Sequence, residues 1–332
     1  MDGEPMRWCW RALSAASVAS VLLVALAMLL FTPGQAIAGQ SRTVWHPQPN
    51  DPSALSRIYD VNRSAMQAAG APFAKWAAQG RQFLAFDPSG DGRVVEVFGD
   101  LGTADRIAVL VPGVSTTANN FSSGLDNVRV RAPAVQARDL YDATRAAAPG
   151  QRVAVIAWLG YDAPQGIGRD AAREELARAG AASLDRFTQD LTIMRPNATL
   201  TLVGHSYGSV VTGLAAASLP KQVKDLVVVG SPGMGVSRAA DLHTTARVWA
   251  GQAAQDWIDW VPAFQVWGAG HGTLPATPDF GARVFGTSGV VDHDHYLAPG
   301  TASLANIVSI VLGRDSAVTG PNSLTLPPQA SG

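Results

Sequence analysis

The chain contains a single cysteine, Cys9, among 332 residues, and only 15% of its residues are charged. Cys9 lies within the first ten residues, upstream of an apolar run. A protein that loses this segment therefore has no thiol for a disulfide, a nucleophile or a metal site. The formal net charge of −1 provides no basic field for a phosphate backbone, which argues against a nucleic-acid partner.

What is present is apolar: 47% of the residues are hydrophobic, a composition that builds a core. At the N-terminus, Arg7 and Arg11 precede an uncharged run over 12–31, followed by small residues at Ala36 and Ala38. This layout predicts a signal peptide cleaved after residue 38 and a protein that is secreted or associated with the cell envelope. The alternative is an uncleaved anchor, because the run is long enough to span a bilayer. Only in that case do we expect membrane contact.

Three further regions follow the predicted signal peptide of residues 1–38. Residues 39–81 are predicted to form an N-terminal lead-in segment and a helical segment packed on the core. Asp51 is the expected N-cap of the helix and Pro52 its first-turn proline. Residues 82–313 carry the pattern of one large domain. Residues 314–332 are rich in Pro, Ser and Gly and are predicted to be unstructured.

The large domain begins with a predicted β-hairpin, because the β-formers of 82–86 and 93–98 flank the turn sequence D-P-S-G-D-G. Short apolar runs then alternate with helical patterns, which predicts an α/β fold with a mostly parallel sheet and helices on both faces. The expected strands are 106–113, 152–160, 198–204, 223–230, 246–251 and 282–286, and the expected helices include 135–148, 184–194, 207–218 and a last one from about 301.

One motif stands at a strand-to-helix junction. The stretch "TLVGHSYGSVVTG" over 201–213 contains G-x-S-x-G, with Ser206 between a predicted strand and a predicted helix. Glycines at 204 and 208 allow the tight turn that exposes a nucleophilic serine, and a helix N-terminus favours developing negative charge. The alternative interpretation is a phosphate-binding or purely structural glycine turn. The context favours the nucleophile.

A serine nucleophile needs a base and a carboxylate that orients it. On this type of strand-turn-helix scaffold the order along the chain is Ser, acid, His. The acid should follow the strand at 246–251, where Asp256 and Asp259 are available, and the base should follow the last strand, where His293 and His295 are available. The other four histidines come too early in the chain. Both pairs remain open at this point.

The same chemistry needs two backbone amides for the oxyanion. One is expected from Tyr207, the residue after the serine, and the other from the loop after the first long parallel strand, where Val114 is the first candidate and Ser115 the second.

Several blocks together resemble one family. "VLVPGVST", "LVGHSYGS", "VVGSPGMGV", "HGTLPATPDFGARVF" and "DHDHYLAPGTASLANI" are similar to an α/β-hydrolase family that is common in actinobacteria and long catalogued as a domain of unknown function. The resemblance runs from Gln82 to Gly313 in the same order. It implies an α/β-hydrolase fold and a serine hydrolase, with His293, three residues before Tyr296, as base and Asp256 as acid. It implies no substrate.

The expected function is a secreted serine hydrolase, esterase-like, that acts on a small-molecule or lipid ester and needs no cofactor. Three alternatives remain: an acyltransferase on the same fold, a metal-dependent hydrolase that uses the D-H-D-H loop at 292–295, and a catalytically silent binding protein. Trp158, Tyr161 and Trp257 line an acyl cleft or belong to the core.

Overall fold

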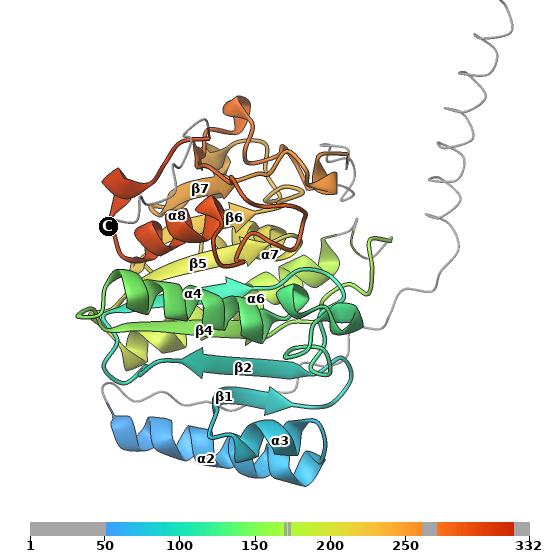
Figure 1. Cartoon of the computed structure of the whole chain (residues 1–332), viewed down its shortest axis with the longest axis vertical. Helices are drawn as coiled ribbons and strands as arrows, with labels where there is room; N and C mark the ends of the chain where they lie inside the picture. Colours follow the sequence, from blue (N-terminus) through green and yellow to red (C-terminus); the bar gives the residue numbers. More distant parts are fainter. Residues whose placement is uncertain (1–50, 169–170, 172–173, 261–270, 322–332) are drawn as a thin grey trace, which may run out of the picture.

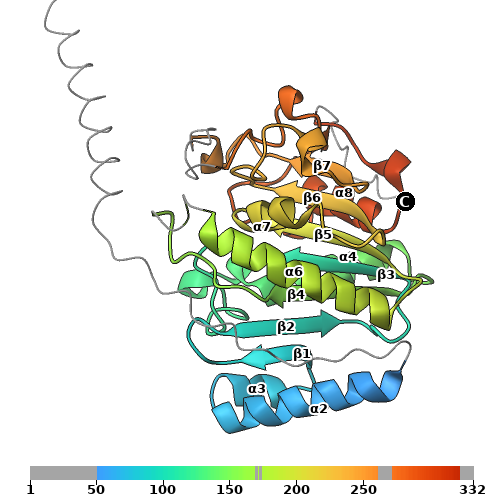
Figure 2. The ribbon, with the colours of Figure 1, turned by 180° about the vertical axis from the view of Figure 1, so that it is seen from behind.

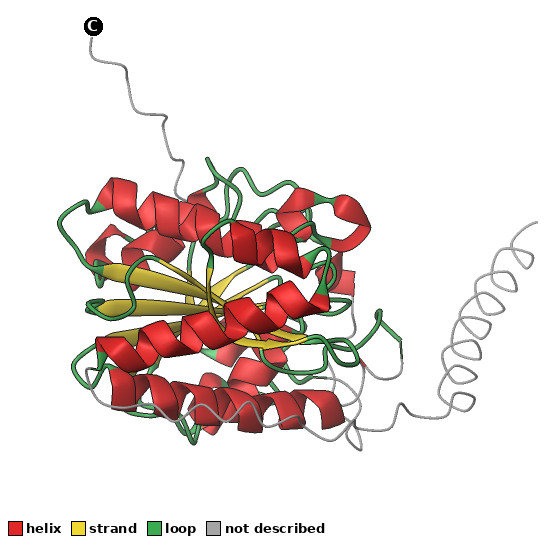
Figure 3. Ribbon diagram, turned by 90° about the horizontal axis from the view of Figure 1, so that it is seen from below, coloured by secondary structure: helices red, strands yellow, loops and turns green. Residues whose placement is uncertain are grey.

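The computed structural model of the chain describes residues 51–168, 171, 174–260 and 271–321, although the side chains of Pro52, Asp259 and Trp260 are outside the description. The predicted signal segment and residues 322–332 lie outside these ranges. Eight strands form one sheet in the order β1-β2-β4-β3-β5-β6-β7-β8. Helices cover both faces of the sheet (Figure 3). The predicted α/β-hydrolase fold class is confirmed.

The antiparallel end of the sheet begins with the predicted hairpin. Strands β1 (Gln82–Asp87) and β2 (Arg93–Phe98) pair antiparallel, and β2 pairs antiparallel with β4. Helices α2 (Pro52–Ala69) and α3 (Phe73–Ala78) lie along the β1 edge (Figure 1). The predicted cap is present, since the Asp51 carboxylate accepts from the Ser53 amide at 2.9 Å.

A buried ion pair joins the two arms of this hairpin. Glu96 is almost fully buried and accepts two hydrogen bonds from the Arg81 guanidinium, at 2.5 and 2.6 Å. Burial raises the pKa of Glu96 more than the hydrogen bonds and charge of Arg81 lower it. Removing either residue would therefore leave the other one buried without its ion-pair partner, which is destabilising.

The remaining strands run parallel and are nearly continuous apolar stretches, because helices bury both faces. They are β3 (Arg106–Val111), β4 (Val153–Leu159), β5 (Thr199–His205), β6 (Val223–Val229), β7 (Arg247–Gly251) and β8 (Arg283–Val284). Parallel strands place their carboxyl ends at one edge, where the loops after β3, β5, β7 and β8 meet.

Two layers of helix cover the sheet. Helices α4 (Pro133–Ala147) and α8 (Ala302–Val311) lie on one face (Figure 1), and α6 (Glu175–Met194) and α7 (Gly208–Ala215) on the other (Figure 2). Short 3₁₀ turns occupy the loops: η1 (Leu125–Asn127), η2 (Arg129–Arg131), η3 (Ala239–Leu242), η4 (Trp257–Trp260), η5 (Pro278–Phe280) and η6 (Asp315–Ala317). No helix within the described ranges is long and apolar enough to cross a membrane.

The start of the expected C-terminal tail is held against the domain. Asp315, in η6, pairs with Arg247 of β7, and the Thr319 amide donates to Asn306 of α8 at 2.8 Å. The Gly286 amide donates in turn to the Thr319 carbonyl at 2.9 Å. Composition alone suggested an unstructured segment from residue 314, but these hydrogen bonds and the ion pair order residues 315–319.

Candidate active site

Ser206 occupies a sharp turn between β5 and α7. Its backbone is left-handed, with φ of 54°, a conformation that costs a non-glycine residue about 1–2 kcal/mol. A Cβ on Gly208 would lie 2.1 Å from the Val111 carbonyl oxygen, and one on Gly204 would lie 2.8 Å from the Ser209 Cα. Only glycine fits at either position, so the G-x-S-x-G spacing is a steric requirement of this turn.

The serine side chain faces a cavity of about 270 Å³ that His205, Trp257 and His293 also line. Gly113, in the loop after β3, permits the close approach of that loop, because a Cβ there would lie 2.7 Å from the Ser206 Cβ. The cavity thus opens at the carboxyl ends of the strands, where a parallel sheet binds its ligands.

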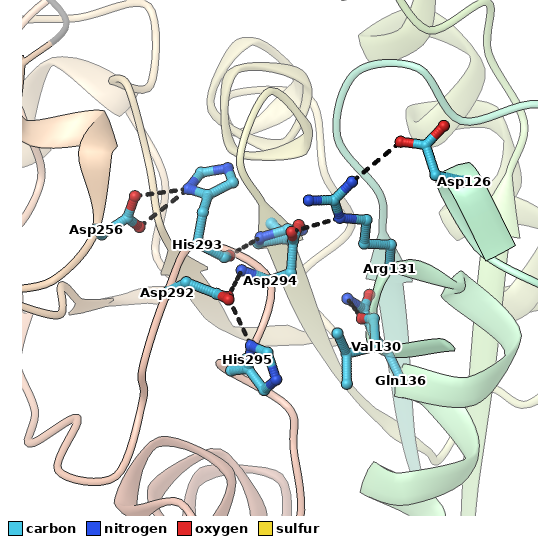
Figure 4. Close-up of polar contacts among 10 residues, drawn as sticks. Asp126, Val130, Arg131, Gln136, Asp256, Asp292, His293, Asp294 and His295 are labelled. Atoms are coloured by element: carbon cyan, nitrogen blue, oxygen red, sulfur yellow. Dashed lines mark hydrogen bonds and ion pairs between the residues drawn. The ribbon is translucent and has the colours of Figure 1, made fainter. Parts of the chain in front are cut away.

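Asp256 and His293 form a direct hydrogen-bonded pair at this edge (Figure 4). Both Asp256 oxygens lie close to the His293 Nδ1, at 2.8 and 3.0 Å. The carboxylate also accepts from the Ile258 amide at 2.9 Å and from the Tyr296 hydroxyl at 2.7 Å. Burial acts to raise the pKa of Asp256, but the hydrogen bond and charge of His293, with these two donors, lower it below its ordinary value.

This pairing determines which nitrogen of His293 is available. A carboxylate at Nδ1 selects the tautomer with the proton on Nδ1 and leaves Nε2 as the basic nitrogen. The indole of Trp257 packs against the imidazole with ring centroids 4.7 Å apart. His293 is therefore buried and held from two sides, as a general base requires.

His205, the residue before the serine, also contacts His293. Its Nε2 lies 2.8 Å from the His293 carbonyl oxygen, and the two rings have centroids 5.0 Å apart. Burial, reinforced by the neighbouring His293, lowers the pKa of His205 to about 4. The ring is neutral near pH 7, so its Nε2–H donates to that carbonyl.

The D-H-D-H loop separates its side chains. His295 Nδ1 lies 2.6 Å from the Asp292 carboxylate, and Asp294 accepts from the Arg131 Nε at 2.7 Å (Figure 4). Of the two histidines in this loop, His293 and not His295 contacts Asp256. Across the part of the chain that the structure describes, no three His, Cys, Asp or Glu side chains gather as metal ligands.

The second acid candidate, Asp259, follows Asp256 within the same loop. Its backbone lies in η4, and its side chain is outside the description. Asp256, by contrast, is held in place in the loop after β7, because its carboxylate accepts a hydrogen bond from the Ile258 amide.

The oxyanion candidates differ in what their amides do. The Ser115 amide donates to the Pro164 carbonyl at 2.7 Å, which removes it as a donor. The Val114 amide has no acceptor within the described residues, and Val114 lines the cavity beside Ser206. Tyr207 is the N-cap residue of α7, and its hydroxyl accepts from the Ala177 amide at 3.2 Å. Val114 and Tyr207 therefore remain the pair of candidates.

Gly230, at the end of β6, is a site residue that the sequence analysis missed. Its φ is +54°, and a Cβ there would come within about 3 Å of Asp256, His293 and Tyr296. The sequence signal was the glycine that ends the run V-V-V-G, but without the fold nothing related this glycine to Asp256 and His293. Gly230 provides the space in which that pair packs.

The three aromatic candidates for an acyl cleft divide between core and cavity. Trp158 and Tyr161 are 2% exposed and stack on each other in the core, with ring centroids 6.0 Å apart. Trp257 is 40% exposed and lines the cavity. Only Trp257 is therefore placed to meet a ligand.

Comparisons with known proteins agree with this architecture. A family model described as "Alpha/beta hydrolase" matches residues 87–266. The uncharacterized protein Rv2079 of Mycobacterium tuberculosis is 31% identical over 277 residues, which cover 74% of this chain and 41% of that protein. The uncharacterized protein Mb0988c of Mycobacterium bovis is 37% identical over 176 residues, which cover 50% of this chain and 63% of that protein. The chain thus matches less than two thirds of the length of either relative.

Two solved structures are similar at low identity. XC6422 from Xanthomonas campestris, described as an α/β serine hydrolase without a lid, is 15% identical with a TM-score of 0.38, covering 70% of this chain and 93% of that one. Esterase PE8 is 17% identical with a TM-score of 0.43, covering 65% of this chain and 96% of that one. With the family model matched over more than half of its length, the chain belongs to the alpha/beta hydrolase family.

Proposed function

We propose that the protein is a serine hydrolase that cleaves carboxylic esters through an acyl-enzyme. Ser206 is the nucleophile, His293 the general base and acid, and Asp256 the carboxylate that orients and stabilises the imidazolium. The observation that carries the proposal is the buried Asp256–His293 hydrogen bond at a cavity shared with a serine in a left-handed turn.

In the acylation step, the Ser206 Oγ attacks the acyl carbon while His293 Nε2 takes the hydroxyl proton. The amides of Val114 and Tyr207 hold the oxyanion that forms on the carbonyl oxygen. The C–O bond to the alcohol then breaks, and the alcohol leaves with the proton from His293. Water repeats the sequence on the acyl-enzyme and regenerates the serine.

A fluorophosphonate probe tests the nucleophile, because it labels a serine only where a base and an oxyanion site activate it. We expect covalent labelling of the parent protein and none of Ser206→Ala. Equal labelling of both proteins, or of neither, contradicts the proposal. His295→Ala is the matched control for the base: it should label like the parent, whereas His293→Ala should not.

Export of the protein is a separate proposal, supported by the residue pattern that precedes position 39. Expression of the full chain in an actinobacterial host, followed by N-terminal sequencing of the protein from medium and cell envelope, tests it. A new N-terminus at Gly39 is expected. An intact Met1 in the membrane fraction supports the anchor instead.

A further inference from the structure

Exposed apolar side chains gather at the mouth of the Ser206 cavity. Leu125, Ile167 and Trp257 are 38%, 73% and 40% exposed, and all three line the cavity. Single exposed apolar residues are ordinary, but their convergence on one concave site marks a binding surface. We call these three residues the apolar rim.

The rim is assembled from separate parts of the chain. Leu125 begins η1 in the connection between β3 and α4, Ile167 lies in the connection after β4, and Trp257 begins η4 after β7. None of these connections shares a helix or strand that would bring the side chains together for packing. Their common feature is the cavity that contains Ser206.

The volume of the cavity indicates how long an acyl chain has to be to reach the rim. At about 270 Å³ it lies just below the range of pockets that enclose a drug-sized ligand. An acetyl or butyryl group fills only part of this volume, whereas a longer unbranched chain reaches the rim side chains that line the same cavity.

The charges at the mouth select against an anionic substituent. Among the described residues that line the cavity, Arg131 is the one cation, but its Nε donates to Asp294 at 2.7 Å and its Nη1 lies 3.4 Å from Asp126 (Figure 4). One cation with two carboxylates gives this group a net negative charge. His205 is neutral near pH 7 because its pKa is about 4. A substrate chain that ends in a carboxylate therefore meets no free cation among the described residues of the cavity.

We infer that the preferred substrates carry a neutral, unbranched aliphatic acyl chain of about six to eight carbons, whose distal methylenes contact Leu125, Ile167 and Trp257. This inference rests on the proposed function, since it concerns the acyl group that Ser206 receives. Full burial of a methylene group favours binding by up to about fourfold. On a half-exposed rim we expect kcat/KM to rise about twofold for each added methylene.

The test compares 4-nitrophenyl acetate, butyrate, hexanoate and octanoate below their aggregation concentrations, with each kcat/KM divided by the rate constant of alkaline hydrolysis. Six added methylenes at about twofold each predict a rise of roughly sixtyfold in this corrected value from acetate to octanoate, and a rise below about tenfold contradicts the inference. Ile167→Ser and Leu125→Ser should each lower the octanoate-to-acetate ratio at least about threefold. The control Val61→Ser removes an apolar side chain that is 68% exposed on α2 and should leave the ratio unchanged.

Several results overturn the inference while the proposed function stands: esters hydrolysed with no rise in rate with chain length, a ratio that the rim variants do not change, or a monosuccinate ester hydrolysed faster than the butyrate. A rise in the corrected kcat/KM with chain length that occurs only above the aggregation concentration also overturns it. Such a rise indicates that the protein binds to the surface of the aggregated ester and has no site for a single acyl chain. The absence of both ester hydrolysis and Ser206-dependent labelling refutes the proposed function, and with it this inference.

Discussion

The replacement Asp256→Asn tests the proposed triad most directly. Both carboxylate oxygens lie within 3.0 Å of the His293 Nδ1, so an amide has to place its nitrogen near either that atom or the Tyr296 hydroxyl. In the first case the imidazole takes the wrong tautomer, and in either case the imidazolium loses its counter-charge. We expect kcat for 4-nitrophenyl butyrate to fall about 10⁴-fold, which is about 5 kcal/mol of transition-state stabilisation.

Three measurements isolate this effect from misfolding. The circular dichroism spectrum of Asp256→Asn should match that of the parent, because the two side chains have nearly the same shape. Tyr296→Phe removes one donor to the same carboxylate but no charge, and should cost no more than about tenfold. Asp259→Asn, in the same loop, should leave kcat unchanged. The reasoning is refuted if Asp256→Asn keeps more than a tenth of the parent activity. It is also refuted if Asp259→Asn lowers kcat more than Asp256→Asn does.

Three further predictions concern the turn, the hairpin and the buried histidine. Gly208→Ala should abolish labelling by a fluorophosphonate, because the new Cβ would meet the Val111 carbonyl oxygen at 2.1 Å; labelling at the parent rate would contradict this. Arg81→Ala should lower the free energy of unfolding by about 3–5 kcal/mol in urea denaturation, since Glu96 is left buried without its partner; a loss below 1 kcal/mol on that scale would show that the pair is dispensable. The pKa of His205 is about 4 in the folded protein against 6.5 ordinarily, so the unfolded chain binds its proton first as pH falls, and stability should drop by about 3 kcal/mol between pH 6.5 and 4. His205→Asn should flatten this part of the pH profile, and an unchanged profile would place the titration elsewhere.

The strand and helix pattern was accessible from residue order because each element carries its own local signal. Continuous apolar runs such as 153–159 indicate strands buried on both faces, and Pro133 and Gly313 lie near the ends of helical periodicity. The same local logic located the Ser206 turn, since a strand, a glycine pair and a helix are neighbours in the sequence. These features need no knowledge of distant contacts.

The choice between the histidines of the D-H-D-H loop required the tertiary structure. Two-residue spacing suggests that His293 and His295 share one face of an extended segment, but the His295 amide donates to the Asp292 carbonyl at 3.4 Å and closes a turn. The turn directs His293 toward Asp256 and His295 toward Asp292. The turn itself is local, but the partner of His293 is Asp256 from the loop after β7, so a local pattern does not reveal which histidine meets that carboxylate.

The sequence by itself determined the fold class, the order of the strands and helices along the chain and the glycine-flanked turn at Ser206, because these depend on neighbours within a few residues. Only the tertiary structure decided that Asp256 and His293 meet, that Gly230 leaves room for them, and that Leu125, Ile167 and Trp257 surround one cavity. These residues come from loops far apart in the chain, and the parallel sheet brings the loops together at the carboxyl ends of its strands.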